Sequence, residues 1–195
     1  MNHGLAMPSP PAELIDLLRA NADRSGLWRL TTYGKGLVIG DWEDDRPRLI
    51  VVERGLVKLS YITREGDERI KSFIAAPGLF DQDATTAPPF VEATSLEATQ
   101  VVALPLSWVR DLAASDVLVQ QAVDTFWLWL SAKKRLRESA LLCSTPLQRF
   151  ARLQCDEPLL LSKLSQGDIA RYLGITPIAF SRLKRRAQAQ APAIP

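Results

Sequence analysis

QGDIARYLGITPIAFSRLKR, residues 166–185, carries the pattern of two short helices that cross at a tight turn. Gly174 stands at the turn, where a residue without a Cβ atom can take a positive φ and end the first helix. Thr176 then offers an N-cap hydroxyl, and Pro177 follows at the first helical position, which suits its fixed φ. The apolar positions on the side that the two helices share are Ile169, Ala170, Leu173, Ile175, Phe180 and Leu183.

The segment therefore predicts a helix-turn-helix, whose second helix reads base edges with its exposed residues. Arg182 is the best candidate for a base contact, because a guanidinium can bond two acceptors of a guanine. Ile178 can touch a thymine methyl group, and the cations near the helix end suit either phosphates or the last helix carbonyls. The predicted DNA-binding residues are Gln166, Thr176, Pro177, Ile178, Ser181, Arg182, Lys184, Arg185 and Arg186.

The charge distribution favours DNA over the two alternatives, which are an ordinary helical hairpin with a solvated basic face and a helix-turn-helix kept for protein contacts. Residues 131–186 hold 12 Lys and Arg against four Asp and Glu, whereas residues 1–130 hold 12 against 18. A basic C-terminal unit attracts a polyanion and an acidic N-terminal unit repels one. Nucleic acid is therefore expected at the C-terminal end only.

Length and composition limit which other classes of function are possible. The 195 residues, 47% of them hydrophobic, suit one larger and one smaller domain. The most apolar run, residues 117–132, is interrupted by polar side chains, and no apolar leader opens the chain, so a cytoplasmic protein without a membrane span is expected. Cys143 and Cys155 lack CxxC spacing and a neighbouring His, so they are expected to be buried thiols, with no metal or cofactor.

Residues 11–26 predict a short amphipathic helix, after which the apolar pattern shortens. Apolar runs at 36–39, 48–52, 56–62, 69–74, 91–96 and 100–104 alternate with turn residues, as in a β-sandwich or barrel. Residues 63–67, TREGD, predict a hairpin tip. The helical period returns after Pro105, so the fold class is α+β.

Residues 115–141 predict one long helix with two apolar stripes. Such a helix can bury one side against its own β-domain and the other against a twofold mate, or it can lie wholly in the core of a monomer. The dimer hypothesis places Leu118, Ala122, Phe126, Trp129 and Leu136 at the interface.

This layout resembles the Crp/Fnr family of transcription regulators. The likeness is carried by VVERGLVKLSYITREGDERIKSFIAAPGLF at residues 51–80, by TPLQRFARL at residues 145–153 and most closely by SQGDIARYLGITPIAFSRLKRR at residues 165–186. The resemblance implies a cyclic-nucleotide-binding-like antiparallel β-roll (a double-stranded β-helix or jelly roll) at 1–114, a long dimerisation helix at 115–142 and a C-terminal helical helix-turn-helix domain at 143–195. It also implies a homodimer on an inverted-repeat DNA operator, with RNA polymerase as a further partner.

The chain departs from the family's cyclic-nucleotide site. Nucleotide-binding relatives carry a Gly-Glu turn and an Arg followed by a small residue, whereas this chain reads GLFDQ at 78–82 and has no Lys or Arg between Lys71 and Arg110. The cysteine cluster of redox sensors and the His of haem sensors are also missing, since the first cysteine is Cys143 and the one histidine is His3. These departures predict a degenerate effector domain with an uncharged or apolar effector, or with none.

Two further hypotheses stay open at this point. The β-roll can serve only as a platform for assembly or for a protein partner, without a small ligand. An enzyme or metal-binding cupin has a similar number of strands, but its metal needs several His or mixed His/Glu ligands, and the expected strands contain no His. The chain also lacks Ser-His-Asp, Cys-His and Gly-rich phosphate motifs, so no catalytic site is expected.

Overall fold

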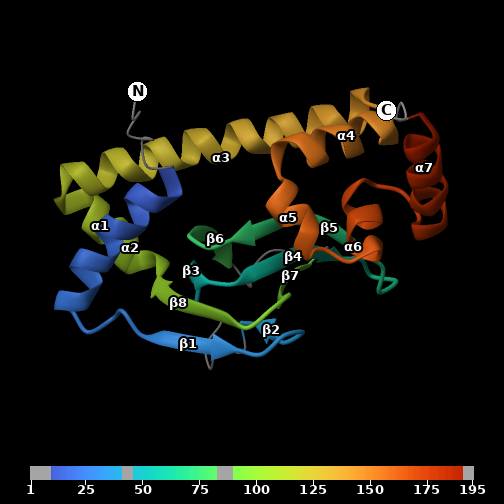
Figure 1. Ribbon diagram of the computed structural model, residues 1–195. Coiled ribbons are helices and arrows are strands. Elements are labelled where there is room, and N and C mark those ends of the chain that lie inside the picture. Colours follow the sequence, from blue (N-terminus) through green and yellow to red (C-terminus); the bar gives the residue numbers. More distant parts are fainter. Residues whose placement is uncertain (1–9, 41–45, 83–89, 191–195) are drawn as a thin grey trace, which may run out of the picture.

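The computed structural model describes residues 10–40, 46–82 and 90–190. Two antiparallel sheets face each other, and one long helix runs above them to a group of short helices at the far end (Figure 1). The elements in chain order are α1 (Pro10–Arg24), β1 (Leu30–Tyr33), β2 (Val38–Ile39), β3 (Arg48–Arg54), β4 (Leu56–Ile62), β5 (Glu68–Ala75), β6 (Gly78–Gln82), β7 (Phe90–Ser95), β8 (Thr99–Pro105), α2 (Leu106–Ser115), α3 (Val117–Cys143), α4 (Pro146–Asp156), α5 (Pro158–Lys163), α6 (Gln166–Tyr172) and α7 (Pro177–Gln190).

The strand order is β1-β8-β3-β6 in one sheet and β2-β7-β4-β5 in the other. Strand β3 is buried on both faces, because its alternate side chains enter two different cores. Ile50 and Val52 pack between the two sheets, whereas Leu49 and Val51 pack against α1, α2 and α3. The β-roll therefore supports the long helix through the outer face of one sheet.

The predicted α+β architecture is confirmed, and so is the hairpin tip: the amide of Thr63 donates to the carbonyl of Asp67 at 3.0 Å. Two strands, β1 and β6, were not predicted. Strand β1 reads LTTY and is almost wholly exposed, so it has no apolar alternation to detect. Strand β6 reads GLFDQ, a stretch too short and too mixed to stand out from a loop.

One of the two apolar stripes of helix α3 is buried within its own chain. Val119, Ala122 and Phe126 are buried, and Ala122 and Phe126 pack in the core that α1 and the β-roll form. The expectation that Ala122 and Phe126 face a second subunit is therefore wrong for those two residues, because they are only 5% and 2% exposed in the single chain. Among the described helices, none is both long enough and apolar enough to cross a membrane.

Gly55 holds the tight connection between β3 and β4. Its φ is +97°, and a Cβ atom there would lie 2.5 Å from Oγ1 of Thr99 and 2.8 Å from the carbonyl of Ala98. Gly66, at the hairpin tip, has a similar φ of +84° but open space around the Cβ position. The two glycines share a backbone conformation and differ in their neighbours.

We predict that Gly55→Ala lowers the free energy of unfolding by about 3 kcal/mol, the sum of left-handed backbone strain and a clash. Gly66→Ala is the matched control and should cost about 1–2 kcal/mol, from the backbone alone. Urea denaturation of both variants measures the difference. Equal losses would show that contact with β8 does not constrain this turn.

Candidate nucleic-acid interface

The helix-turn-helix forms as its local sequence predicts. Ser165 caps α6, since its hydroxyl accepts from the amide of Asp168 at 3.0 Å. Gly174 takes a φ of +71°, and the amides of Gly174 and Ile175 donate to carbonyls of the last turn of α6. The hydroxyl of Thr176 accepts from the amide of Ala179 at 3.2 Å and so caps α7.

The inner side of α7 is held by aromatic and aliphatic packing. Phe180 is 1% exposed and meets Phe150 of α4 edge-on, with ring centroids 5.1 Å apart. The same core contains Leu56 of β4, so it joins the helix-turn-helix to the β-roll. The predicted apolar positions of the motif all enter this core: Ile169, Ala170, Leu173 and Phe180 are buried, and Ile175 and Leu183 are partly buried.

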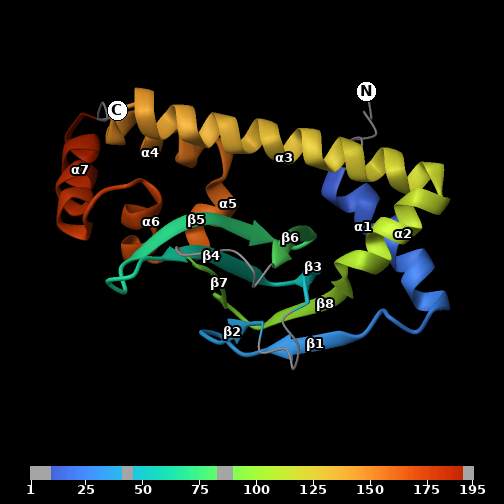
Figure 2. The same cartoon turned by 180° about the vertical axis from the view of Figure 1, so that it is seen from behind.

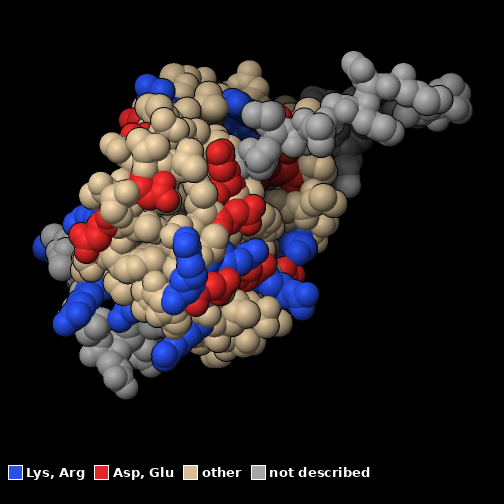
Figure 3. Space-filling model, turned by 90° about the vertical axis from the view of Figure 1, so that its left-hand side faces the viewer, with Lys and Arg blue, Asp and Glu red and all other residues tan. Residues whose placement is uncertain are grey.

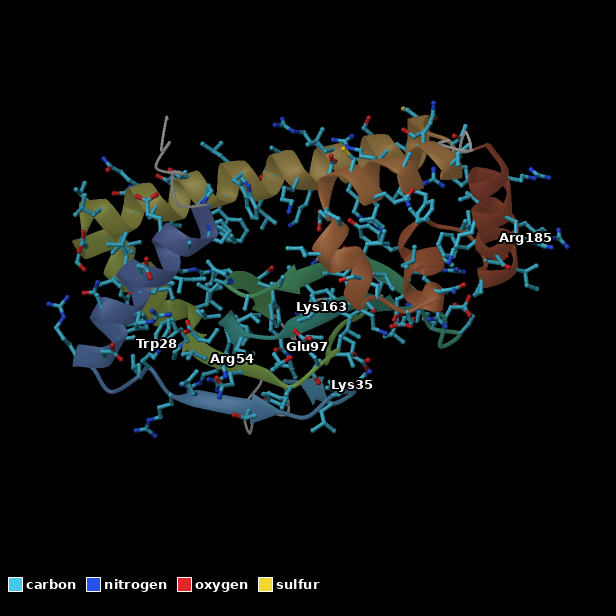
Figure 4. The ribbon with its side chains drawn as sticks, in the orientation of Figure 1. Trp28, Lys35, Arg54, Glu97, Lys163 and Arg185 are labelled. Carbon is cyan, nitrogen blue, oxygen red and sulfur yellow. The ribbon has the colours of Figure 1, made fainter. Side chains whose placement is uncertain are left out.

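The outer side of α7 carries most of the predicted DNA-binding residues. Ile178 is 68% exposed, and Ser181, Arg182, Arg185 and Arg186 are also exposed. Arg185 projects away from the body of the molecule (Figure 4). Thr176 and Pro177 are exposed at the start of α7, Gln166 is exposed at the start of α6, and Lys184 is half-buried.

The cations of α7 differ from those at the other end of the molecule. Within the described part of the chain, no carboxylate lies within 4 Å of Arg182, Lys184, Arg185 or Arg186. At the end formed by α1 and α2, acidic and basic side chains lie beside one another (Figure 3). Arg182 and Arg186 also line a shallow groove between α7 and residues 145–147.

Other cations of the basic C-terminal part point toward the β-roll. Counting charges along the sequence did not reveal this orientation. Lys163 pairs with Glu97 of the β-roll at 2.8 Å (Figure 4), and Arg171 lies 3.6 Å from Glu68. The acidic β-roll therefore attracts the basic C-terminal part of the chain. The same negative charge disfavours DNA on the surface of the β-roll. Only part of the C-terminal basic charge is available to a polyanion.

The strongest of these contacts is a four-residue network between the β4–β5 hairpin and α6. Lys58 Nζ lies 2.6 Å from Glu68 Oε1 and 3.6 Å from Asp168 Oδ1. Burial alone would raise the pKa of Glu68, but hydrogen bonds from Lys58 and Ser60 and the charge of Arg171 outweigh it. The pKa of Glu68 is therefore held below its ordinary value.

Two arginines, Arg149 and Arg137, tie α3 to the helix-turn-helix. Arg149 donates to the carbonyls of Ser144 and Leu173, and so joins the end of α3 to the turn before α7. Arg137 donates to the carbonyls of Ile70 and Tyr172 at 3.0 Å each. Sequence reasoning missed both, because a helical Arg in a basic segment gives no signal of pointing inward.

The cysteine prediction is wrong in one respect. Cys143 and Cys155 are unpaired, but both are exposed rather than buried. Each lies on the outward side of an amphipathic helix, α3 or α4, whose inner side is filled by larger apolar residues. Across residues 10–40, 46–82 and 90–190, no three His, Cys, Asp or Glu side chains gather as a metal site requires.

Comparisons with known proteins agree with this arrangement, although no family model matches the chain. The fumarate and nitrate reduction regulatory proteins of Yersinia pestis and of Escherichia coli strain K12 are each 29% identical to it over 168 residues. The match covers 79% of this chain and 66% of each relative. The chain therefore spans slightly less than two thirds of the length of these curated relatives.

Solved structures share the fold at lower identity. FixK2 from Bradyrhizobium japonicum superposes with a TM-score of 0.65 at 21% identity, covering 84% of this chain and 85% of its own. A cyclic nucleotide-binding domain containing protein from Listeria monocytogenes EGD-e superposes with a TM-score of 0.71 at 14% identity, covering 91% and 92%. The CooA mutant from Carboxydothermus hydrogenoformans gives 0.69 at 16%, covering 91% and 84%.

We predict that Glu68→Gln lowers the free energy of unfolding by about 1 kcal/mol at pH 7, because it removes the charge that Lys58 and Arg171 face. The pKa of Glu68 is lowered in the fold, so its contribution is present above the ordinary value of 4.5 and is lost as pH falls through the folded value. The difference between variant and wild type should therefore shrink as the pH falls below 4.5.

Urea unfolding between about pH 3 and pH 7 tests this, with Glu138→Gln, an exposed position on α3, as the control. A Glu68→Gln deficit that persists unchanged into acid would contradict the electrostatic account.

Proposed function

Because the chain is related to the Crp/Fnr transcription regulators, as its sequence resemblance predicted, we propose that it is a sequence-specific DNA-binding transcription regulator of that type. It acts in the cytoplasm, as a homodimer on an inverted-repeat operator. A contact with RNA polymerase stays a prediction of the resemblance. No catalytic step is part of this proposal, and the named relatives are regulatory proteins.

One observation carries the proposal: the outer side of α7 presents cations that no described carboxylate neutralises, around an exposed apolar residue, Ile178. Protein surfaces usually intersperse charges of both signs, so an unpaired cationic helix face suits a polyanion. The capped start of α7 places Ile178 in the first turn and Arg182 in the second, and a recognition helix reads bases with its first turns.

Arg182→Ala should weaken binding to the preferred operator by about 1–3 kcal/mol and relax the preference at one base position per half-site. Arg185→Ala should weaken binding to all sequences more evenly and reduce the salt slope, because it loses a phosphate contact. Arg54→Ala, an exposed arginine on β3 away from α7, is the control and should change neither (Figure 4).

Selection of the operator from random DNA, followed by binding curves at several salt concentrations, measures these effects. An Arg182→Ala variant with wild-type affinity and preference would rule out base reading by Arg182.

The homodimer is proposed along the side of α3 that its own chain leaves open. Val117, Leu118, Leu128, Leu136 and Leu142 on this helix are 53–77% exposed. So many exposed aliphatic residues on one helix favour an apolar partner surface. The proposal retains Leu118 and Leu136 of the predicted interface, with Trp129 half-buried beside them, and adds Leu128 in place of Ala122 and Phe126.

Leu128→Glu should convert the dimer into a monomer, because a charge would be buried at the centre of an apolar interface. Leu159→Glu is the matched control, since Leu159 is 82% exposed on α5 and lies outside the proposed interface. Sedimentation at micromolar concentration gives the oligomeric state. A wild-type protein that is monomeric and still binds the operator tightly would overturn the dimer.

We also propose that cyclic nucleotides are not the effector. GLFDQ at residues 78–82, which stands where family receptors carry the Gly-Glu turn, forms β6, and residues 83–89 after it lie outside the described residues. The argument therefore rests on the missing Arg and Gly-Glu turn. Calorimetric titration with cyclic AMP and cyclic GMP should give no binding at micromolar concentration. A micromolar dissociation constant for either would refute this part of the proposal.

A further inference from the structure

The shallow groove between α7 and residues 145–147 has a volume of about 400 Å³. It lies where the start of α4 meets the side of α7, at the end of the molecule opposite α1 (Figures 1 and 2). This volume lies within the range of ligand sites, so the groove can take a few side chains of a partner.

Most of the lining is apolar. Leu147 is 40% exposed, so its own chain covers it only in part. An apolar surface that the chain leaves open favours contact with apolar side chains of another molecule. The apolar lining residues are Pro146, Leu147, Ile175, Ala179 and Leu183.

The two charged residues of the lining, Arg182 and Arg186, are both cations and both exposed. They stand four residues apart on α7, and so lie on one side of the helix, about 6 Å apart along its axis. In the part of the chain that the structure describes, no carboxylate lies within 4 Å of either guanidinium. A partner with two carboxylates at the same spacing would therefore complement both.

The start of α4 offers little to a phosphate in this groove. The hydroxyl of Thr145 accepts from the amide of Gln148 at 3.3 Å, and the amide of Thr145 donates to Oε1 of Gln148 at 2.9 Å. Pro146 has no amide hydrogen. The apolar side chains of the lining also cannot donate to phosphate oxygens, which bind to N–H and O–H groups. The lining therefore suits an apolar and acidic partner better than a nucleic-acid strand.

We propose that this groove docks an amphipathic acidic helix of another protein. Its apolar side chains contact the apolar part of the lining, and its carboxylates pair with Arg182 and Arg186. Helices that bind in grooves use apolar anchors three and four residues apart. A helix docked in this way covers Arg182, so the partner and the DNA operator exclude each other. This exclusion, unlike the docking itself, rests on the proposed function.

A synthetic peptide of about 16 residues, long enough to form a helix, tests the docking on the full chain without DNA. Its Leu residues recur at every third and fourth position, and Glu fills most of the others. One control peptide carries Gln in place of every Glu, and a second carries Ser in place of every Leu. We expect a dissociation constant of about 100 µM or tighter for the acidic peptide by fluorescence anisotropy, and binding at least about tenfold weaker for both controls.

Variants of the chain locate the site. Leu147→Ser and Arg186→Gln should each weaken the acidic peptide about fivefold or more, because each removes a contact with the bound helix. Arg185→Gln is the matched control, since Arg185 is an exposed neighbour on α7 that does not line the groove. Leu147→Ser should leave operator affinity unchanged, because Leu147 is not among the proposed DNA-contacting residues.

No binding of the acidic peptide at about 1 mM, equal binding of the Gln peptide, or equal losses from Arg185→Gln and Arg186→Gln would each overturn the docking. A Leu147→Ser variant that loses operator affinity but keeps the peptide would assign the groove to the DNA backbone instead.

Competition tests the exclusion separately. The acidic peptide should displace a labelled operator from the wild-type protein, and a complex that holds both at once would refute the exclusion. A protein that binds the peptide but no operator would contradict the proposed function while supporting the docking.

Discussion

Arg137 of α3 joins the long helix both to the β-roll and to the helix-turn-helix. Its side chain leaves α3, donates to a carbonyl of β5 and to the carbonyl that ends α6, and stacks on the ring of Tyr172. Three parts of the molecule therefore meet at one guanidinium. Burial lowers the pKa of Arg137, and the neighbouring Tyr172 opposes that effect. A guanidinium nevertheless stays charged in proteins, and here it is held by neutral backbone carbonyls. Removing it would take this donor away from two part-buried carbonyls, and a carbonyl left without a partner costs more than the hydrogen bond contributes.

Around Arg137, apolar contacts hold the elements together and ionic contacts orient them. Leu56 of β4 enters the core formed by α4, α6 and α7, and apolar burial of this kind holds elements together without specifying their angle. The angle is set by directional contacts at the edges of that core: the Lys58–Glu68–Asp168–Arg171 network on one side and the Lys163–Glu97 pair on another. Arg149 then joins the end of α3 to the turn that precedes α7. The orientation of the exposed face of α7 follows from contacts made far from that face.

The features that depend on neighbouring residues along the chain were predicted from the sequence. The features that depend on contacts between distant segments were missed. Gly174, Thr176 and Pro177 define a turn within a few residues, so the two helices and their inner faces are correctly predicted. The inward orientation of Arg137 and Arg149 could not be predicted, because each partner is a backbone carbonyl that exists only once the units have docked. The same reason explains Ala122 and Phe126: an apolar stripe shows that something covers it, and only the fold shows that α1 and the β-roll do so. Strand β1 went unseen because an exposed polar strand is stabilised by its register with β8 rather than by burial.

A cavity of about 330 Å³ lies between β5, β6, α3 and α6, and this placement sets how strongly a ligand there could act on α7, the helix proposed to contact DNA. A ligand shifts a conformational equilibrium only by the difference between its affinities for the two arrangements. One that touched the β-roll and α3 alone would bind equally well with α6 docked or undocked, and would change nothing. A ligand in this cavity that contacted Tyr172 as well would lose part of its site if α6 undocked, so its binding would weaken. If that weakening is tenfold, docking is favoured by about 1.4 kcal/mol, which is comparable to a single contact of the Glu68 network. Such a ligand and the Glu68 ion pairs, which join β5 to α6, would therefore favour docking with similar strength.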